Sequence, residues 1–301
     1  MRTRLPKPHD RLPLGRTGVF VSPVCVGMTS EATVIKAYEA GINFFFLSAD
    51  AHWTHYHGIR AGLSTLLSDN PGRRSELVVA IVSYFDEPFF HQAGQFAETV
   101  AAVPGLGYAD ILVAGATTGR NLDRMDSLTR LKASSHCGSR GVGATFHHRP
   151  SALAAANAGH LDLSYVRYNT GYSGARTDIF PHLCANRQSL LFTFKSVTFP
   201  VTAEEFSNLP AAERLWLPKV EDYYRFPLSD EAVNGILCSP GSPHQLATLL
   251  ATLDKEPLST EEQDYMIRLS SLAHHSNSLA SRVSAWWDNP VETPAKPVGS
   301  V

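Results

Sequence analysis

Short apolar runs alternate with longer amphipathic segments along almost the whole chain, and this alternation is the strongest constraint on its fold. Short apolar runs bounded by loops predict buried parallel strands, and the amphipathic segments between them predict helices. The strand candidates are Val24–Gly27, Ile42–Leu47, Leu77–Ser83, Asp110–Ala114, Gly141–Thr145, Leu161–Arg167, Leu190–Phe194 and Val233–Cys238. Seven or eight such units close into a barrel more readily than they form an open sheet. We therefore expect an α/β fold, a (β/α)8 TIM barrel.

Helical patterns follow most of these strands. The helix candidates are Ser30–Ala40, His57–Ser68, Gln92–Val103, Asn121–Ala133 and Ala152–Ala158. Between Pro200 and Asp230 aromatic and charged residues mix without a clear strand, so we expect a helix and an extended loop there. Ser259 and Glu262 have the spacing of a capping box, in which a hydroxyl and a carboxylate bind free amides at a helix start. A final helix is therefore predicted from this point to about Trp286.

Composition limits the number of domains and the classes of partner. With 301 residues, 44% of them hydrophobic, the chain can build one large core, and we predict a single domain over residues 1–288. Residues 289–301 are rich in Pro, Gly and Ser and are expected to form a flexible tail. The formal net charge is only −2 and no basic stripe is present, so nucleic acid is not an expected partner.

The apolar segments and the cysteines indicate the cellular compartment that we expect for the protein. No stretch approaches the roughly 20 apolar residues of a membrane span, so no membrane partner is expected. The four cysteines are widely spaced and form no Cys-x-x-Cys pair, which fits a reduced, cytoplasmic protein. The partner predicted from the sequence is a small-molecule substrate.

Several segments, in order, resemble one barrel family. Leu14–Pro23 (LGRTGVFVSP) resembles the N-terminal hairpin that closes the bottom of the barrel in aldo-keto reductases. Ala37–Phe45 is similar to the first helix and second strand of that family, and Tyr108–Leu112 to its fourth strand. Tyr224–Leu228 and Ala232–Leu237 resemble its approach to strand eight. The resemblance spans roughly residues 12–270 and implies a barrel with an N-terminal β-hairpin and an extra C-terminal helix.

The resemblance does not extend to the residues that the family uses for hydride transfer. That family places an aspartate, a tyrosine, a lysine and a histidine at the top of strands two to four. The tyrosine donates a proton, and the lysine lowers its pKa. The aspartate, lysine and histidine positions fall here on Phe46, Val82 and Gly115. The chain is thus identified as a divergent member of the aldo-keto reductase superfamily that lacks most of the catalytic tetrad.

The cofactor-binding positions of the family also differ. Gln245 and Leu249 stand where the resemblance would place an arginine and an asparagine for the 2′-phosphate of NADPH, and Tyr165 stands near the position of the nicotinamide-binding glutamine. Gly241 and Ser242 precede a helix, so their backbone amides still offer an anion site. The sequence does not predict NADPH binding in the usual manner.

A polar cluster follows the second strand, at the end of the barrel where this fold places active sites. It contains Asp50, His52, His55, Tyr56 and His57. Carboxylate and neutral imidazole are ligands for zinc or iron, so one hypothesis is a divalent metal held by His52, His55 and His57. The other hypothesis is an acid–base role for one of these histidines, whether or not a metal is bound, and Asp50, His52 and His55 are the candidate catalytic residues of the cluster. Solvated loop histidines with no such role are the competing structural explanation.

A second polar stretch follows the sixth strand. Arg167 and Asn169 alternate with Tyr168, and we expect all three, with His147 after strand five, to contact the substrate. An inward-pointing arginine is a bidentate anchor for a carboxylate or phosphate, although an arginine that bridges strands is an equally good explanation. Lys195 after strand seven is a candidate base or Schiff-base amine, or else the partner of a carboxylate.

Three functions remain open from the sequence. The first is a divergent aldo-keto-reductase-like enzyme that acts on a small organic molecule with a His/Asp-rich site in place of the tetrad. The second is an atypical NAD(P)H-dependent carbonyl reductase that uses Tyr56, with Lys195 as its cation. The third is a non-catalytic relative that binds a ligand or another protein. Oxidoreductase activity of the usual kind is not expected.

Overall fold

The computed structural model describes residues 2–50, 53–84, 89–117, 138–198 and 200–275, and it shows a closed barrel of eight parallel strands. The barrel strands are β3 (Val24–Val26), β4 (Phe44–Ser48), β5 (Val78–Ser83), β6 (Ile111–Thr117), β7 (Gly141–Phe146), β8 (Leu163–Arg167), β9 (Leu190–Phe194) and β10 (Gly235–Cys238). They follow chain order around the barrel, and β10 pairs with β3 to close it. All eight predicted strands are present, so the (β/α)8 prediction is confirmed.

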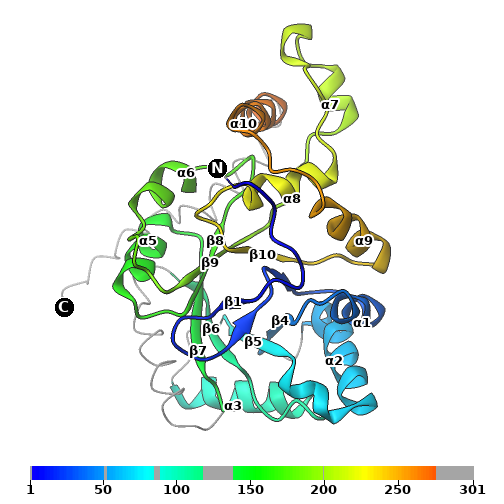
Figure 1. Cartoon of the computed structure of the whole chain (residues 1–301), viewed down its shortest axis with the longest axis vertical. Helices are drawn as coiled ribbons and strands as arrows, with labels where there is room; N and C mark the ends of the chain where they lie inside the picture. Colours follow the sequence, from blue (N-terminus) through cyan, green and yellow to red (C-terminus); the bar gives the residue numbers. More distant parts are fainter. Residues whose placement is uncertain (1, 51–52, 85–88, 118–137, 199, 276–301) are drawn as a thin grey trace, which may run out of the picture.

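An antiparallel hairpin covers the end of the barrel where the strands begin. Its strands are β1 (Leu12–Pro13) and β2 (Phe20–Val21), and Figure 1 shows the hairpin in front of the barrel. Leu14 and Val19 are buried beneath it. The predicted hairpin is therefore present, and we call this end of the molecule the base.

The helices surround the barrel. They are α1 (Glu31–Glu39), α2 (His57–Asp69), α3 (Phe89–Ala101), α5 (Arg149–Ala158), α6 (Ala175–Asp178), α7 (Ala203–Ser207), α8 (Val220–Leu228), α9 (Pro243–Thr252) and α10 (Thr260–His275). The prediction placed the start of α5 at Ala152, but the helix begins at Arg149 because Pro150 fits the first turn, where no amide is needed. Helix α3 likewise begins at Phe89, before the predicted Gln92. The candidate helix Asn121–Ala133 lies outside the described residues.

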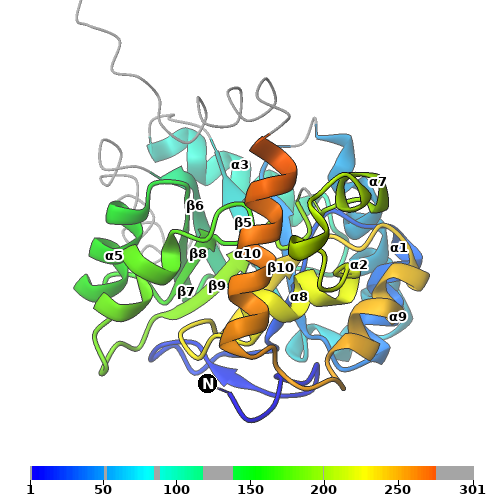
Figure 2. The ribbon, with the colours of Figure 1, turned by 90° about the horizontal axis from the view of Figure 1, so that it is seen from above.

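The segment between Pro200 and Asp230 holds two helices, α7 and α8, where the sequence predicted one and a loop. Figures 1 and 2 show α7 beside α10, outside the ring of barrel helices. A small apolar cluster joins them, and its buried residues are Val201, Tyr265, Leu269 and Ala273. The hydroxyl of Tyr265 donates to the carbonyl of Trp216 at 2.7 Å, which ties the intervening loop to α10. Tertiary packing thus orders a segment whose local pattern was ambiguous.

The start of α10 was predicted correctly. The amide of Ser259 donates to Glu262 Oε2 at 2.7 Å, and the amide of Glu262 donates to Ser259 Oγ at 3.2 Å. These two bonds are the expected capping box. The predicted continuation to Trp286, the tail and the upper limit of the single domain lie outside the described residues. None of the helices in the described ranges combines the length and the apolar character that a bilayer crossing requires.

An aspartate or asparagine precedes every second barrel strand at the base. In each case its side-chain oxygen accepts the backbone N–H of a residue at the start of the preceding strand or, for Ser22, just before it. The four bonds run from Ser22 to Asn43 (2.7 Å), Val79 to Asp110 (2.9 Å), Val142 to Asp162 (2.9 Å) and Leu191 to Asn234 (2.8 Å). In the last three pairs the amide of the Asp or Asn also donates to its partner's carbonyl. Backbone groups that begin the strands are thereby satisfied without water.

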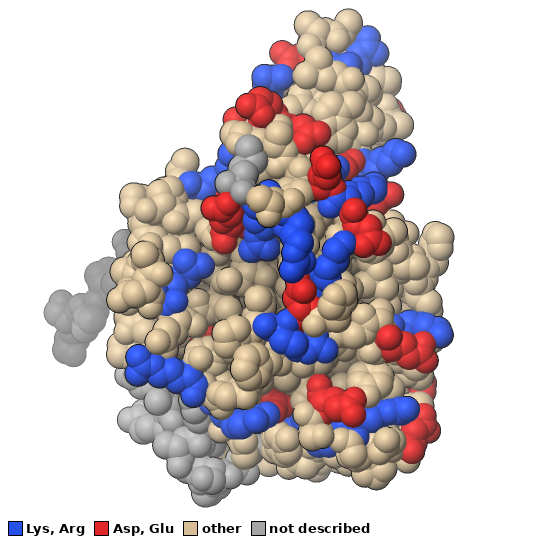
Figure 3. All heavy atoms as spheres, viewed as in Figure 1, with Lys and Arg blue, Asp and Glu red and all other residues tan. Residues whose placement is uncertain are grey.

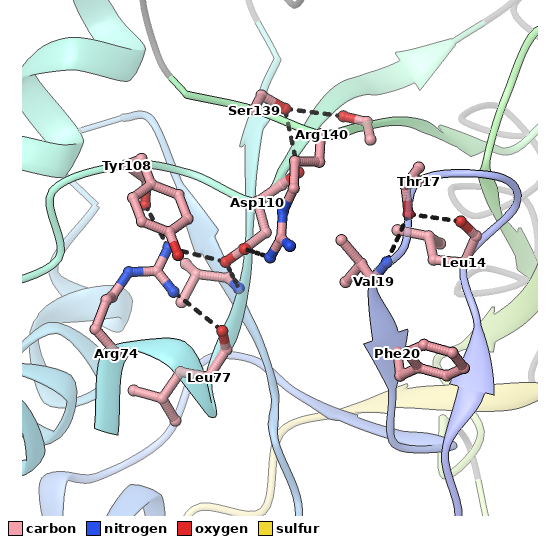
Figure 4. Close-up of polar contacts among 12 residues, drawn as sticks. Leu14, Thr17, Val19, Phe20, Arg74, Leu77, Tyr108, Asp110, Ser139 and Arg140 are labelled. Atoms are coloured by element: carbon pink, nitrogen blue, oxygen red, sulfur yellow. Dashed lines mark hydrogen bonds and ion pairs between the residues drawn. The ribbon is translucent and has the colours of Figure 1, made fainter. Parts of the chain in front are cut away.

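Asp110 is the most heavily bonded member of this set (Figure 4). Its buried carboxylate accepts Arg74 at 2.9 Å and Arg140 at 2.8 Å, besides the amide of Val79. The guanidinium of Arg74 also lies 3.6 Å from the ring centre of Tyr108 and donates to backbone carbonyls. The carboxylate of Asp110 thus links the starts of β5, β6 and β7.

Candidate functional site

Two residues with unfavourable backbone geometry identify the opposite end of the barrel as the candidate site. Among the described non-glycine residues, only Ala116 (φ +49°) and Lys195 (φ +62°) have a positive φ. Ala116 is the second-last residue of β6, and Lys195 directly follows β9, so both lie at the carboxyl ends of barrel strands. Such strain costs about 1–2 kcal/mol per residue and clusters at functional sites. In this fold the carboxyl ends are also where active sites are built.

Aromatic rings fill the centre of the barrel below this end. Phe46 contacts Tyr165 edge-on, with ring centres 5.3 Å apart, and Phe44 contacts Phe192 in the same way at 5.6 Å. All four rings are buried. The hydroxyl of Tyr165 lies 3.6 Å from Cys25 Sγ. Burial raises the pKa of both Tyr165 and Cys25, so this phenol and this thiol remain neutral near pH 7.

The three tetrad positions given by the resemblance lie in this apolar surrounding. Phe46 packs on Tyr165, and Val82 is fully buried on β5. A Cβ atom at Gly115 would lie only 2.2 Å from Cδ1 of Tyr84, so the ring of Tyr84 covers the place where a side chain at residue 115 would begin. The sequence interpretation did not single out Tyr84. Its position directly after β5 was the available signal.

Strand β6 bends at the same place. Its register with β7 shifts between Ala114 and Thr117, and the amide of Ala116 donates to Thr145 Oγ1 at 2.7 Å. An irregularity of this kind ends the regular pairing and redirects side chains near active sites. The bulge and the Tyr84 ring together shape one side of the candidate site.

Tyr56, the candidate proton donor of the reductase alternative, is buried beside two other rings. It stacks on Trp53 with ring centres 6.1 Å apart, and Trp53 lies 5.3 Å from Tyr84. Burial raises the pKa of Tyr56 well above its usual range, with smaller contributions from Tyr84 and Cys25, whereas Arg60 opposes the shift. Arg60 is thus a cation that acts on Tyr56.

Lys195, the other half of that alternative, has an exposed side chain beyond β9. The candidate base or Schiff-base amine thus lies at the surface. Its backbone carbonyl, in contrast, is engaged by the side chain of Asn169 at 2.8 Å.

The histidine-rich loop shows only part of the arrangement that its sequence suggested. His55 and His57 are exposed, on the turn Thr54–Tyr56 and at the start of α2, and His52 lies outside the described residues. Asp50 follows β4, and its carbonyl accepts Arg60 at 3.1 Å. Within the described ranges no three His, Cys, Asp or Glu side chains come together as a metal site. The metal hypothesis thus remains a prediction that depends on His52.

A second polar group lies at the carboxyl ends of β7, β8 and β9. Phe146 pairs with Val166, and Arg167 pairs with Phe194, so His147 and Arg167 leave neighbouring strands at the same level. The ring of His147 meets Phe194 edge-on at 5.4 Å. Arg167 is 8% exposed, and its guanidinium carbon lies 3.2 Å from the ring centre of Tyr172. The structure therefore brings together two of the predicted substrate-binding residues.

The other two predicted substrate-binding residues are placed differently. Tyr168 packs between Phe180 and Phe226 on the outer side of β8, away from Arg167. Asn169 is buried, and its side-chain oxygen accepts the amides of Gly171 and Tyr172 at 3.1 and 2.9 Å. Asn169 thus shapes the turn that carries Tyr172.

The predicted anion site after β10 is occupied by its own side chains. The amide of Gly241 donates to Gln245 Oε1 at 2.7 Å, and Ser242 Oγ accepts the amide of Gln245 at 3.3 Å. These bonds cap the start of α9. Gln245, which stands where the resemblance would place an arginine, accepts an amide N–H that a phosphate would need.

Solved structures with the same fold are found by structural comparison. No protein-family model matches the sequence, and no curated protein matches it. An aldo-keto reductase structure from Bacillus halodurans in its holo form superposes with a TM-score of 0.64 at 15% identity, covering 87% of this chain and 96% of that one. A Pseudomonas aeruginosa protein assigned to the aldo-keto reductases gives a TM-score of 0.60 at 18% identity, covering 83% and 98%. The chain thus has the fold of these reductases over nearly their whole length.

Proposed function

We propose that this chain is a barrel enzyme that acts on a small organic molecule without the hydride-transfer tetrad. The observation that carries the proposal is the ring cluster at the barrel centre, where Phe46 packs on Tyr165 and Tyr84 covers Gly115. The two reductases of the same fold support an enzyme as the class of protein. The strained residues Ala116 and Lys195 support a functional role for the carboxyl ends.

The residues present do not fit a nicotinamide cofactor bound as the family resemblance implies. Tyr165 stands near the position where the resemblance would place the nicotinamide-binding glutamine, and its hydroxyl lies 3.6 Å from Cys25 Sγ. Gln245 occupies the amide of Gly241, which a phosphate would otherwise accept. A bound nicotinamide would have to displace buried rings, which is costly in a close-packed interior.

The polar groups available for chemistry lie on the rim of the site. His147 has the position and the residue type of an acid–base group, and its ring is held against Phe194. Arg167 lies beside it on the neighbouring strand, with its guanidinium held on Tyr172. We assign proton transfer to His147 and substrate contact to Arg167.

A calorimetric titration with NADPH and then NADH tests the absence of a reductase site. We expect no binding at millimolar concentration of either nucleotide. Micromolar binding of either one would contradict the proposal and favour the reductase alternative. A Tyr56→Phe variant, assayed with carbonyl substrates, would then be the next measurement.

Turnover is tested by incubating the protein with a metabolite extract and following loss of individual compounds by mass spectrometry. We expect at least one compound to be consumed by the natural protein and not by His147→Gln. His148→Gln is the matched control, because His148 is the exposed neighbour that bonds to Ser151 at 2.9 Å. Equal consumption by the natural protein and His147→Gln would remove His147 from the reaction. No consumption of any compound would favour a non-catalytic binding protein.

A further inference from the structure

The end of β8 continues into a turn that is bonded more tightly than a connecting loop requires. Asn169 accepts two successive amides of this turn and pairs with Tyr172 as an isolated antiparallel bridge. Its side-chain nitrogen donates to the carbonyl of Lys195, the residue held at φ +62°. One buried amide side chain therefore fixes both the β8 turn and the strained end of β9.

The consequence for Arg167 is a fixed orientation. Tyr172, whose amide Asn169 holds, places its ring 3.2 Å from the guanidinium carbon of Arg167. A guanidinium at this distance over a ring centre lies flat on the ring, and its N–H groups then point outward in one plane. This planar set of donors matches the two oxygens of a carboxylate, or two oxygens of a phosphate.

We infer that the carboxyl ends of β7, β8 and β9 form an oxyanion subsite for the substrate, with Arg167 as the contact to the anion and Asn169 as a positioning residue. The inference rests on the proposed function, because it names the substrate class of that same site: a small organic carboxylate or phosphate. His147 and Phe194 form the adjoining wall, which places an aromatic edge and an imidazole next to the anion.

Benzoate and benzamide are the probes that test the inference, because they have the same shape and differ in charge. Each is titrated into the full-length protein by calorimetry, and inorganic phosphate is titrated in parallel. We expect saturable binding of benzoate and weaker or undetectable binding of benzamide. Phosphate should compete with benzoate if the subsite accepts two oxygens of either anion. Binding of benzoate without competition by phosphate would assign the subsite to carboxylates. Binding of phosphate alone would assign it to phosphates.

Arg167→Gln should weaken binding of the anion about 10-fold or more, since a charge-assisted bidentate contact is lost. Arg268→Gln is the matched control, because Arg268 also lies over a tyrosine, Tyr265, at 5.8 Å but on α10. Binding of neither anion by the natural protein, or equal binding by Arg167→Gln, would overturn the inference. Micromolar binding of a nicotinamide nucleotide would instead contradict only the proposed function, so the two failures are distinguishable.

The positioning role of Asn169 is tested by a measurement that separates anion affinity from stability. Asn169→Ala should lower both the melting temperature and the benzoate affinity, whereas adding Lys195→Gly should restore the melting temperature because glycine accepts a positive φ. We expect the benzoate affinity of this double variant to stay low. Recovery of both together would show that Asn169 acts only through stability. Tyr172→Leu, which removes the ring but keeps the turn's backbone bonds, should weaken benzoate binding in the same direction even if Asn169→Ala does not fold.

Discussion

The two ends of the barrel differ in which residue types adopt a positive φ. At the base, tight turns are made by glycine: the described glycines with positive φ are Gly15, Gly18, Gly41, Gly105, Gly107, Gly138 and Gly159, and they lie in the hairpin or in segments that lead into strands. At the carboxyl ends, Ala116 and Lys195 adopt such geometry with a side chain present. The base is relaxed and the other end is strained, which is the distribution expected where one end carries stability and the other function.

The two ends also differ in how many of their buried contacts are polar. The base holds the four Asp and Asn pairs and the Asp110 ion network, in which buried donors and acceptors are matched. Figure 3 shows lysine and arginine side chains gathered over the middle of this face. Near the N-terminus, Lys7 pairs with Asp254 at 2.6 Å. The carboxyl ends instead enclose rings, with Arg167 and His147 at their edge. Matched polar contacts thus hold the base, and aromatic packing organises the site.

The largest expected effect is at the base. Asp110→Ala leaves the charge of Arg74 buried without its carboxylate and removes the acceptor for Val79, so it should cost about 3–5 kcal/mol in the free energy of unfolding. Urea denaturation measures this. Asp264→Ala, which breaks the more exposed pair with Arg176, should cost about 0–1 kcal/mol. Equal losses in the two variants would contradict the stabilising role of the base.

A smaller loss is expected from a single methyl group at the carboxyl ends. Gly115→Ala places a Cβ 2.2 Å from the ring of Tyr84, and overpacking of this kind costs about 1–3 kcal/mol. The loss should largely disappear when Tyr84→Ala is already present, and a double-mutant cycle by urea denaturation measures the coupling. If the two changes were additive, the Tyr84 ring would not be what excludes a side chain from residue 115.

The contrast in backbone strain predicts changes of opposite sign. Ala116→Gly should stabilise the fold, by about 1 kcal/mol, because glycine accepts a positive φ. Gly159→Ala should destabilise the fold by a similar amount because its φ is +72°. Steric clash does not contribute to this loss, since no atom lies within 4 Å of the new Cβ. Thermal denaturation of both variants compares the two ends directly. Stability changes of the same sign in the two variants would contradict the contrast in backbone strain between the two ends.

The partly buried phenol of Tyr84 predicts a loss of stability in alkali. Burial raises the pKa of Tyr84 to about 12, whereas an unfolded tyrosine titrates near 10. The folded state then binds more protons than the unfolded state in this window, so stability is complete below pH of about 10 and falls as the pH rises towards 12. Unfolding in urea at increasing pH measures the slope, which Tyr84→Phe should reduce. An unchanged slope would show that Tyr84 titrates as an exposed phenol.

Most of the fold was predictable because parallel barrel strands are buried on both faces and therefore appear as apolar runs. All eight were found with ends shifted by at most a few residues. The segment between Pro200 and Asp230 was less predictable, because α7 and the loop after it pack against α10, and α8 packs on the main core. Secondary structure fixed by distant packing leaves little periodicity in the local sequence.

The candidate site was predictable in part. The sequence placed His147 and Arg167 on neighbouring strands, since consecutive strands of a barrel are adjacent in space. It missed Tyr84, because the role of that ring depends on a glycine 31 residues later and on the register of β5 with β6. It also assigned Asn169 to the substrate, whereas its oxygen and nitrogen are bonded to the β8 turn and to Lys195.

The sequence by itself determined the barrel, the hairpin and the position of the polar residues along the chain, because periodicity and turn chemistry are local properties. The tertiary structure alone decided which of those residues meet. The exposed side chains of His55 and His57, the contact of Arg167 with the ring of Tyr172 and the covering of Gly115 by Tyr84 each depend on strand register and backbone strain. Register and strain arise only when the eight strands close, and no single segment encodes them.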